Sequence, residues 1–182
     1  MIIRGALHIH TLCSDGEMDI FEAIDIYKSK GFDFIAFTDH DFLMKNGCYD
    51  VLDELSEDIL IFKGIEKTVF VSGYVHVNEI YGQNEVLRIF NHPADLNMSI
   101  DEILKKIQMT DRLIGIHAVE ITSRGFYTPE IDKEIINYPK VATDDAHNVR
   151  MCGRAWIEMD APLDKDIILR KIKAGDFWNC FI

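Results

Sequence analysis

Apolar, β-branched segments alternate along this chain with segments whose apolar residues recur at helical spacing. This alternation limits the fold more than any other feature, because β-then-α order places successive strands parallel with helical crossovers between them. We predict strands over residues 2–9, 32–37, 59–64, 86–90, 113–121, 140–143 and 155–159. We predict helices over residues 19–30, 49–55, 100–109, 129–136 and 163–173, and an extra hairpin over 68–71 and 74–80 around Ser72-Gly73.

The strand–helix order predicts a barrel with about seven units, close to but short of the usual eight. A flat, doubly wound sheet is the alternative α/β arrangement. The chain has 182 residues and shows no internal repeat or linker, so we expect a single domain over residues 1–182. The apolar tail around Trp178 and Phe181 is expected to pack, either within the barrel or against another chain.

The balance of charges limits the classes of molecule that this chain is expected to bind. The chain carries 19 Lys and Arg against 31 Asp and Glu, a formal net charge of −12. This argues against binding duplex nucleic acid, which needs a basic face. An anionic substrate is still allowed, because bound divalent ions can reverse the local sign of charge.

No apolar run approaches the roughly 20 residues of a membrane-spanning helix, and the sequence does not open with a secretory signal. The cysteines are Cys13, Cys48, Cys152 and Cys180, and no pair has C-x-x-C spacing. We therefore expect reduced thiols in a cytoplasmic protein that makes no contact with membranes.

Histidines and carboxylates follow the predicted strands at the ends where a barrel builds its site. His8 and His10 end the first strand, and residues two apart on a strand point the same way, so both imidazoles can reach one ion. Asp145 and His147 repeat this geometry after a later strand. The remaining candidate ligands are Asp15, His40, Glu66 and His92, and Asp39 is a candidate to orient a neighbouring histidine.

Each of these residues has an ordinary structural interpretation when taken alone, as a core histidine, a turn aspartate or a solvated loop carboxylate. Taken together they are informative, because five successive strand ends each supply an Asp, Glu or His. Carboxylates that face one another repel unless positive charge lies between them. Mixed nitrogen and oxygen ligands suit Zn²⁺, Mn²⁺ or Fe²⁺ rather than Ca²⁺, and their number indicates two or three ions.

The ordered motifs H-x-H, S-D-G, T-D-H, G-I-E, N-H-P and D-A-H, from His8 to His147, resemble those of the PHP (polymerase and histidinol phosphatase) superfamily. The segment from Gly153 to Trp156 and the tail over residues 163–177 also resemble the end of that family. The resemblance implies a single PHP-like domain with a distorted (β/α)7 TIM-like barrel and an extra β-hairpin. It also implies a di- or trinuclear metal centre and, in most members, hydrolysis of phosphate esters.

The same resemblance assigns ligands to individual ions. The first ion takes His8, His10, Glu66 and Asp145, and the second takes Asp15, His40 and His147. A third ion is bridged by Glu66 and bound by His92 and one further histidine. His76 on the hairpin is preferred for this place over His117, which we expect to be structural. Glu120 is expected to support a ligand from outside the metal sphere.

The expected activity is that of a metal-dependent phosphoesterase, a phosphatase or phosphodiesterase, acting on a small phosphorylated metabolite or nucleotide. A metal-bridging hydroxide attacks phosphorus in line, Arg124 clamps the phosphate, and Asp145 or a nearby histidine gives the leaving group its proton. The sequence also allows assembly into a homo-oligomer.

Two other functions compete. One is an amidohydrolase-type hydrolase, which also begins with H-x-H but needs a metal-bridging lysine where this chain has Glu66. The other is a non-catalytic PHP-like binding module, which would be expected to have lost ligands.

Overall fold

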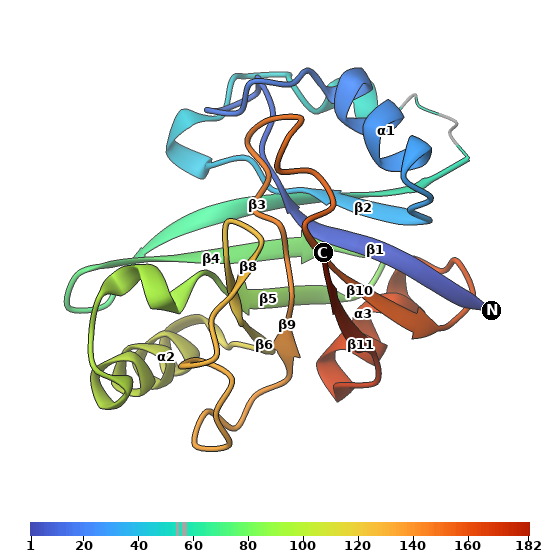
Figure 1. The fold of residues 1–182 in the computed structure, drawn as a ribbon. Coiled ribbons are helices and arrows are strands. Elements are labelled where there is room, and N and C mark those ends of the chain that lie inside the picture. Colours follow the sequence, from blue (N-terminus) through green and yellow to red (C-terminus); the bar gives the residue numbers. More distant parts are fainter. Residues whose placement is uncertain (54, 56–57) are drawn as a thin grey trace.

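The computed structural model describes residues 1–53, 55 and 58–182, and its ribbon is shown in Figure 1. The strands are β1 (Ile2–Ile9), β2 (Phe34–Phe37), β3 (Leu60–Phe70), β4 (Tyr74–Tyr81), β5 (Val86–Phe90), β6 (Ala118–Glu120), β7 (Thr122–Ser123), β8 (Phe126–Tyr127), β9 (Lys140–Val141), β10 (Ala155–Asp160) and β11 (Trp178–Phe181). The α-helices are α1 (Ile20–Ser29), α2 (Ile100–Ile114) and α3 (Lys165–Ala174), and the 3-10 helices are η1 (Asp41–Leu43), η2 (Asp50–Asp53) and η3 (Pro93–Leu96).

One curved sheet organises the molecule. Its strand order among the described residues is β11-β10-β1-β2-β3-β4-β5-β6-β9, with β7 and β8 forming a separate ribbon. The side chain of Asn179 joins the two outer strands: its Nδ2 donates to the Lys140 carbonyl (2.8 Å) and its Oδ1 accepts from Ala142 N (2.7 Å). The sheet is therefore a nearly closed barrel, which confirms the predicted α/β class and barrel shape.

The barrel is less regular than a repeated strand–helix unit. Strands β1, β2 and β3 are parallel, as are β5, β6 and β9. The pairs β3–β4, β4–β5, β1–β10 and β10–β11 are antiparallel. Hairpins connect β3 to β4 and β4 to β5, whereas α3 lies between β10 and β11, and the described residues contain three α-helices. The expected count of seven units is therefore not confirmed.

Two helices begin at caps that the sequence makes recognisable. Asp19 accepts from Glu22 N (2.8 Å) before α1, and Ser99 and Glu102 form a reciprocal capping box before α2. Helix α2 continues to Ile114 and ends before Gly115, whose φ of 75° suits glycine. The predicted strand over 113–121 is therefore wrong at its start, because residues 113–114 belong to the helix and β6 begins at Ala118.

The helix predicted over residues 129–136 is not formed. Ile131 N bonds to Thr128 O and Ile136 N bonds to Lys133 O, which produces a series of turns. Ile131 and Ile136 are both fully buried although they are five residues apart, a spacing that one helix face does not provide. The predicted helix 49–55 is represented by η2, and its residue 54 lies outside the described residues.

The extra hairpin is present and longer than predicted, because β3 continues through Phe70 before the turn at Ser72 and Gly73. The apolar tail forms β11, which pairs antiparallel with β10. None of the helices in the described part of the chain is long and apolar enough to cross a membrane.

The expectation that all four cysteines are reduced is wrong for Cys13 and Cys48, which form a disulfide across 35 residues of sequence. They lie in the loops that follow β1 and β2, and these neighbouring parallel strands bring the two loops together. Cys152 and Cys180 are free thiols. Disulfides are rare in the reducing cytosol, so this bond counts against the expected cytoplasmic location.

Candidate metal centre

The predicted ligands lie together at one end of the barrel. Two isolated parallel bridges draw the strand ends together there, one between Ile9 and Ala146 and one between His40 and Glu66. The first places the segment after β9 beside the end of β1, and the second places the segment after β2 beside β3. The side chains gathered in this way are those of His8, His10, Asp15, His40, Glu66, His76, His92, Asp145 and His147.

Glu66 lies at the centre of this group. Its side chain is 1% exposed, and both carboxylate oxygens contact imidazoles. Oε1 lies 3.4 Å from His8 Nε2, 3.3 Å from His76 Nδ1 and 3.1 Å from His92 Nε2; Oε2 lies 3.1 Å from both His10 Nε2 and His40 Nδ1. A carboxylate offers about four lone-pair positions, so five surrounding imidazoles indicate a carboxylate placed to bridge cations.

Two aspartates complete the group. Asp15 lies 3.3 Å from His10 Nδ1, 3.6 Å from His40 Nε2 and 3.5 Å from His147 Nε2. Asp145 Oδ1 lies 3.4 Å from His8 Nε2 and 3.5 Å from both His10 Nε2 and His147 Nδ1. Asp145 and His92 have positive φ values of 46° and 26°. Backbone strain of this kind is concentrated at functional sites.

The donor set fits divalent metal ions. Three sets of ligand atoms lie within 4.8 Å of one another: those of His10, Asp15, His40 and His147; of His8, His10 and Glu66; and of His40, Glu66 and His76. Within the described residues, the buried Nδ1 atoms of His10 and His40 have no hydrogen-bond partner. A buried imidazole nitrogen without a donor or acceptor is costly unless a cation or a proton satisfies it.

The ionisation of the cluster reflects carboxylates crowded around histidines. Burial alone lowers the pKa of His8, but nearby carboxylates, led by Glu120, raise it well above its ordinary value. Burial also opposes protonation of His10, and the nearby carboxylates of Asp15 and Glu66 nevertheless raise its pKa to about 9. The buried Glu66 carboxyl has a pKa well below its ordinary value because the histidines offset its burial. Without metal, the imidazoles of His8 and His10 therefore favour their protonated forms, and an ion bound there would have to displace those protons.

Glu120, the last residue of β6, supports the centre from behind, as the family resemblance implied. Its Oε1 contacts His8 Nδ1 at 2.6 Å and accepts from the Thr143 hydroxyl, and its Oε2 accepts from His92 N at 2.6 Å. A carboxylate on one imidazole nitrogen fixes the ring and directs the other nitrogen at the ion. Glu120 therefore orients His8 and anchors the segment that carries His92.

Asn91 is a supporting residue that the sequence did not reveal. Its buried amide donates to Glu66 Oε1 (2.7 Å) and to Asn78 Oδ1 (2.8 Å). These bonds hold the central carboxylate in place. The only sequence signal was the position of Asn91 beside His92, and an asparagine at a strand end is usually turn chemistry.

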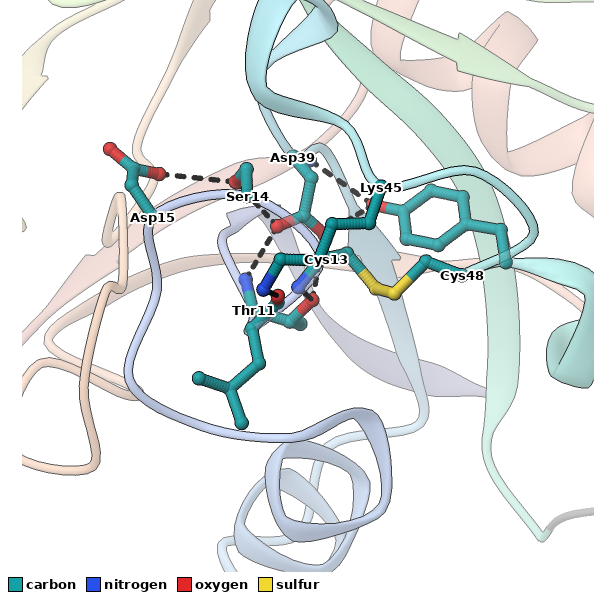
Figure 2. The surroundings of a disulfide bond; sticks show 9 residues. Thr11, Cys13, Ser14, Asp15, Asp39, Lys45 and Cys48 are labelled. Atoms are coloured by element: carbon teal, nitrogen blue, oxygen red, sulfur yellow. Dashed lines mark hydrogen bonds between the residues drawn. A yellow bond between two sulfur atoms is a disulfide. The ribbon is translucent and has the colours of Figure 1, made fainter.

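The loops after β1 and β2 are tied together by Asp39, which the sequence suggested as a partner for a histidine. The structure gives it another role: its carboxylate accepts from Thr11 N (2.7 Å), Thr11 Oγ1 (2.9 Å), Ser14 Oγ (2.6 Å) and Tyr49 OH (2.6 Å). Figure 2 shows these bonds beside Asp15. Asp39 thus fixes the turn that presents Asp15.

The Cys13–Cys48 disulfide connects the same two loops (Figure 2). Lys45 adds to it by donating its backbone N–H to the Cys13 carbonyl (2.9 Å) and its ammonium group to the Leu12 carbonyl. We call residues 10–16 and 38–49 together the braced wall of the centre. The residues from Glu66 to His76 and from Phe90 to Leu96 form the opposite side, which we call the open wall.

Of the two histidines considered for the last ligand position, the structure places His76 beside Glu66. His117 lies outside the centre, where its Nδ1 accepts from Arg88 N at 2.9 Å. Arg124 is exposed in the turn between β7 and β8, and its carbonyl accepts from Arg154. No contact recorded among the described residues joins its guanidinium to the centre, so its role as a phosphate clamp stays a prediction.

A pocket of about 170 Å³ adjoins the centre on the open wall. His76, Asn91 and His92 form its inner side, and Tyr74, Asp95 and Leu96 form the remainder with Val75. The pocket therefore shares two histidines with the metal-ligand group, and a molecule bound in it lies next to the ions.

The fold and the site together define a barrel with a histidine- and carboxylate-rich centre suited to metal ions. A model of the PHP-associated family matches residues 134–177. The chain is 26% identical over 153 residues to the DNA polymerase/3'-5' exonuclease PolX of Bacillus subtilis, covering 73% of this chain and 27% of that protein.

Solved structures of similar fold include two informative examples. A two-domain protein from Bacteroides vulgatus containing a predicted PHP-like metal-dependent phosphoesterase matches with a TM-score of 0.77 and 18% identity, over 100% of this chain and 65% of that one. An amidohydrolase from Chromobacterium violaceum with bound sulfate matches with a TM-score of 0.67 and 13% identity, over 96% and 97% of the two chains. The resemblance to the PHP superfamily is confirmed. The chain spans about a quarter of the length of the polymerase and about two thirds of the Bacteroides protein.

Proposed function

We propose that this chain is a metal-dependent phosphoesterase that hydrolyses a small phosphorylated metabolite or nucleotide at a centre of two or three Mn, Zn or Fe ions. The observation that carries the proposal is Glu66, a buried carboxylate shared by five imidazoles. The metal-dependent phosphoesterase named in the Bacteroides protein of similar fold supports the same reaction class.

The residues of the chain have separate tasks in this reaction. His8, His10, Glu66 and Asp145 would hold the first ion, Asp15, His40 and His147 the second, and His76 and His92 with Glu66 a third. When bound, such ions supply Lewis acidity toward a phosphoryl oxygen and lower the pKa of water. Glu120 and Asn91 keep His8 and Glu66 in position.

Two groups are assigned a part in the chemical step. Arg124 on the rim would hold a phosphoryl oxygen, because a guanidinium matches phosphate oxygens in two hydrogen bonds. Asp145 or a histidine would hold the proton destined for the leaving oxygen. Asp145 is 7% exposed, so water has little access to this carboxylate.

An amidohydrolase-type reaction is the second candidate, favoured by the amidohydrolase of similar fold. The position between the ions is taken here by Glu66 rather than lysine. Lys67, the next residue, pairs with Glu79 at 2.8 Å. A non-catalytic binding module is the third candidate, and the complete set of ligands argues against it.

The test is a substrate panel read by mass spectrometry. Protein loaded with Mn²⁺ meets phosphomonoesters, small phosphodiesters and N-acyl amides, with Asp145→Asn as the variant and exposed Asp160→Asn as its matched control. Release of phosphate by the wild type and the control but not by Asp145→Asn supports the proposal. Amide cleavage alone, or no cleavage by protein shown to hold metal, would refute it.

A further inference from the structure

The pocket on the open wall is assigned no task by the reaction just proposed. The register of the β3–β4 hairpin explains how it is formed. Glu66 faces Asn78, Thr68 faces His76, and Phe70 faces Tyr74. Residues opposite one another or two apart on a strand share a face of the sheet. Tyr74 therefore stands on the same face as Glu66 and His76, farther out toward the hairpin turn.

Tyr74 is available for contact with a ligand. It is 70% exposed, and Phe70 supports its ring at a centroid distance of 5.3 Å in an edge-to-face arrangement. Val75 and Leu96 add apolar surface to the pocket. Half-exposed apolar surface next to a metal centre gains free energy when an organic group covers it.

The volume of the pocket limits the group that fits. A cavity of about 150 Å³ accommodates benzene. The pocket here has about 170 Å³ and is therefore large enough to take one six-membered ring or a chain of similar bulk.

The charge of the pocket limits the group further. Neither lysine nor arginine is among the described residues that line it, and Asp95 contributes a carboxylate. One oxygen of Asp95 accepts from Ser123 Oγ at 2.6 Å, and the other lies 3.8 Å from His92 Nδ1. A second anionic group placed in the part of the pocket away from the ions would meet this carboxylate, and no lysine or arginine among the described lining residues offsets the repulsion.

We propose, resting on the phosphoesterase function above, that this pocket binds the organic group of the substrate and that Tyr74 and Asp95 determine its specificity. The preferred substrate carries one phosphate on a compact, one-ring, uncharged or cationic group. The phosphate lies at the ions, and the organic group stacks against Tyr74. Esters with a second phosphate or a carboxylate on that group are rejected by Asp95.

The test measures binding of phosphonates, which are not hydrolysed, to the Mn²⁺-loaded protein by calorimetry. The wild type binds phenylphosphonate about tenfold more tightly than methylphosphonate, because only the former reaches the pocket. In Tyr74→Ala this ratio falls to about twofold, while methylphosphonate affinity and metal content stay the same. Phe21→Ala, a half-exposed aromatic on α1, serves as the control and keeps the wild-type ratio.

A second ligand measures the effect of the Asp95 carboxylate separately. The wild type binds 4-carboxyphenylphosphonate about tenfold more weakly than phenylphosphonate, and Asp95→Asn removes most of this difference. Because both ligands are measured in each variant, any effect of Asp95 on His92 cancels in the ratio.

The outcomes separate the two proposals. Equal affinities for phenyl- and methylphosphonate, or a ratio that survives Tyr74→Ala, would overturn the pocket assignment and leave the phosphoesterase proposal standing. Failure of methylphosphonate itself to bind metal-loaded protein would count against phosphoryl recognition by the ions, and the pocket assignment would fall with it.

Discussion

The braced and open walls hold ligands of the same centre in different ways. On the braced wall, the His10 side chain is 0% exposed, and a disulfide and four bonds to Asp39 hold the loops around it. On the open wall, the His76 and His92 side chains are 28% and 19% exposed and border a pocket. The walls therefore differ in how their loops are held and in what they border; in the proposed function the braced wall would hold ions and the open wall would leave room for a ligand beside them.

The Glu66 carboxylate contacts histidines of both walls. Its removal is therefore expected to have the largest effect. Glu66→Gln should lower bound metal by at least one ion and reduce phosphoesterase turnover by about a thousandfold or more, since several kcal/mol of charge stabilisation are lost. Elemental analysis and turnover measure the two effects. Glu79→Gln is the matched control, because Glu79 is a buried glutamate of the adjacent strand on the other face.

Removing one histidine of the open wall distinguishes the contributions of the two walls to metal binding. His76→Ala should lose one ion and retain those of the braced wall, with turnover reduced about a hundredfold. Ion content after desalting is the measurement. His117→Ala, a histidine outside the centre, should keep all of its metal, and the reverse result for the two variants would show that the wrong histidine has been placed in the centre.

The disulfide tests the braced wall directly. Cys48→Ser should weaken Mn²⁺ binding at the Asp15–His40–His147 group about tenfold, because the turn that presents Asp15 loses its tie. The free energy of unfolding should fall by about 3 kcal/mol. Metal titration and urea denaturation measure these effects, with Cys180→Ser as the control; unchanged Mn²⁺ affinity would mean that the bond stabilises the fold only.

The outer face of the hairpin should give the smallest effect. Burial by itself raises the pKa of Glu79, but hydrogen bonds from Lys67, Tyr81 and Arg88 lower it to about 2 from an ordinary 4.5. A lowered pKa in the folded state stabilises the protein above pH 4.5, and this contribution is lost as the pH falls toward 2.

Glu79→Gln should accordingly lower the Tm by about 2–4 °C at pH 7 and much less at pH 3. Thermal melts of the wild type and the variant at both pH values provide the comparison. A difference in Tm that grows on acidification would contradict the assigned direction of the pKa shift.

Most of the ligand group could be predicted because many of its members lie at or just after the predicted ends of strands, and the ends of parallel strands meet. His8 and His10 could be recognised because they are two residues apart on a strand, and Asp145 and His147 have the same spacing. Asn91 and the bracing role of Asp39 could not be predicted, because both depend on which loops become neighbours in space. The Cys13–Cys48 bond could not be predicted either, because it also depends on which loops become neighbours.

The fold shows the same division. Capped, strongly periodic helices such as α1 and α2 were predictable, since their signals are local. The antiparallel pairing of β1 with β10 joins the two ends of the chain and has no local signal. The predicted helix over 129–136 failed because burial of Ile131 and Ile136 overrides a favourable proline at the start.

The side chain of Asn179 has a consequence for how the barrel is closed. Around most of the sheet, neighbouring strands are joined by ladders of backbone hydrogen bonds, whereas β9 and β11 are joined by one amide group. The barrel therefore has a seam, and separating it breaks two hydrogen bonds instead of a ladder. Asp145 and His147 follow β9 directly, and two backbone hydrogen bonds hold their segment against β1, from His10 N to Ala146 O (2.9 Å) and from Ala146 N to His8 O (3.1 Å). The seam between β9 and β11 therefore ends before the centre, which stays closed on this side by backbone bonds.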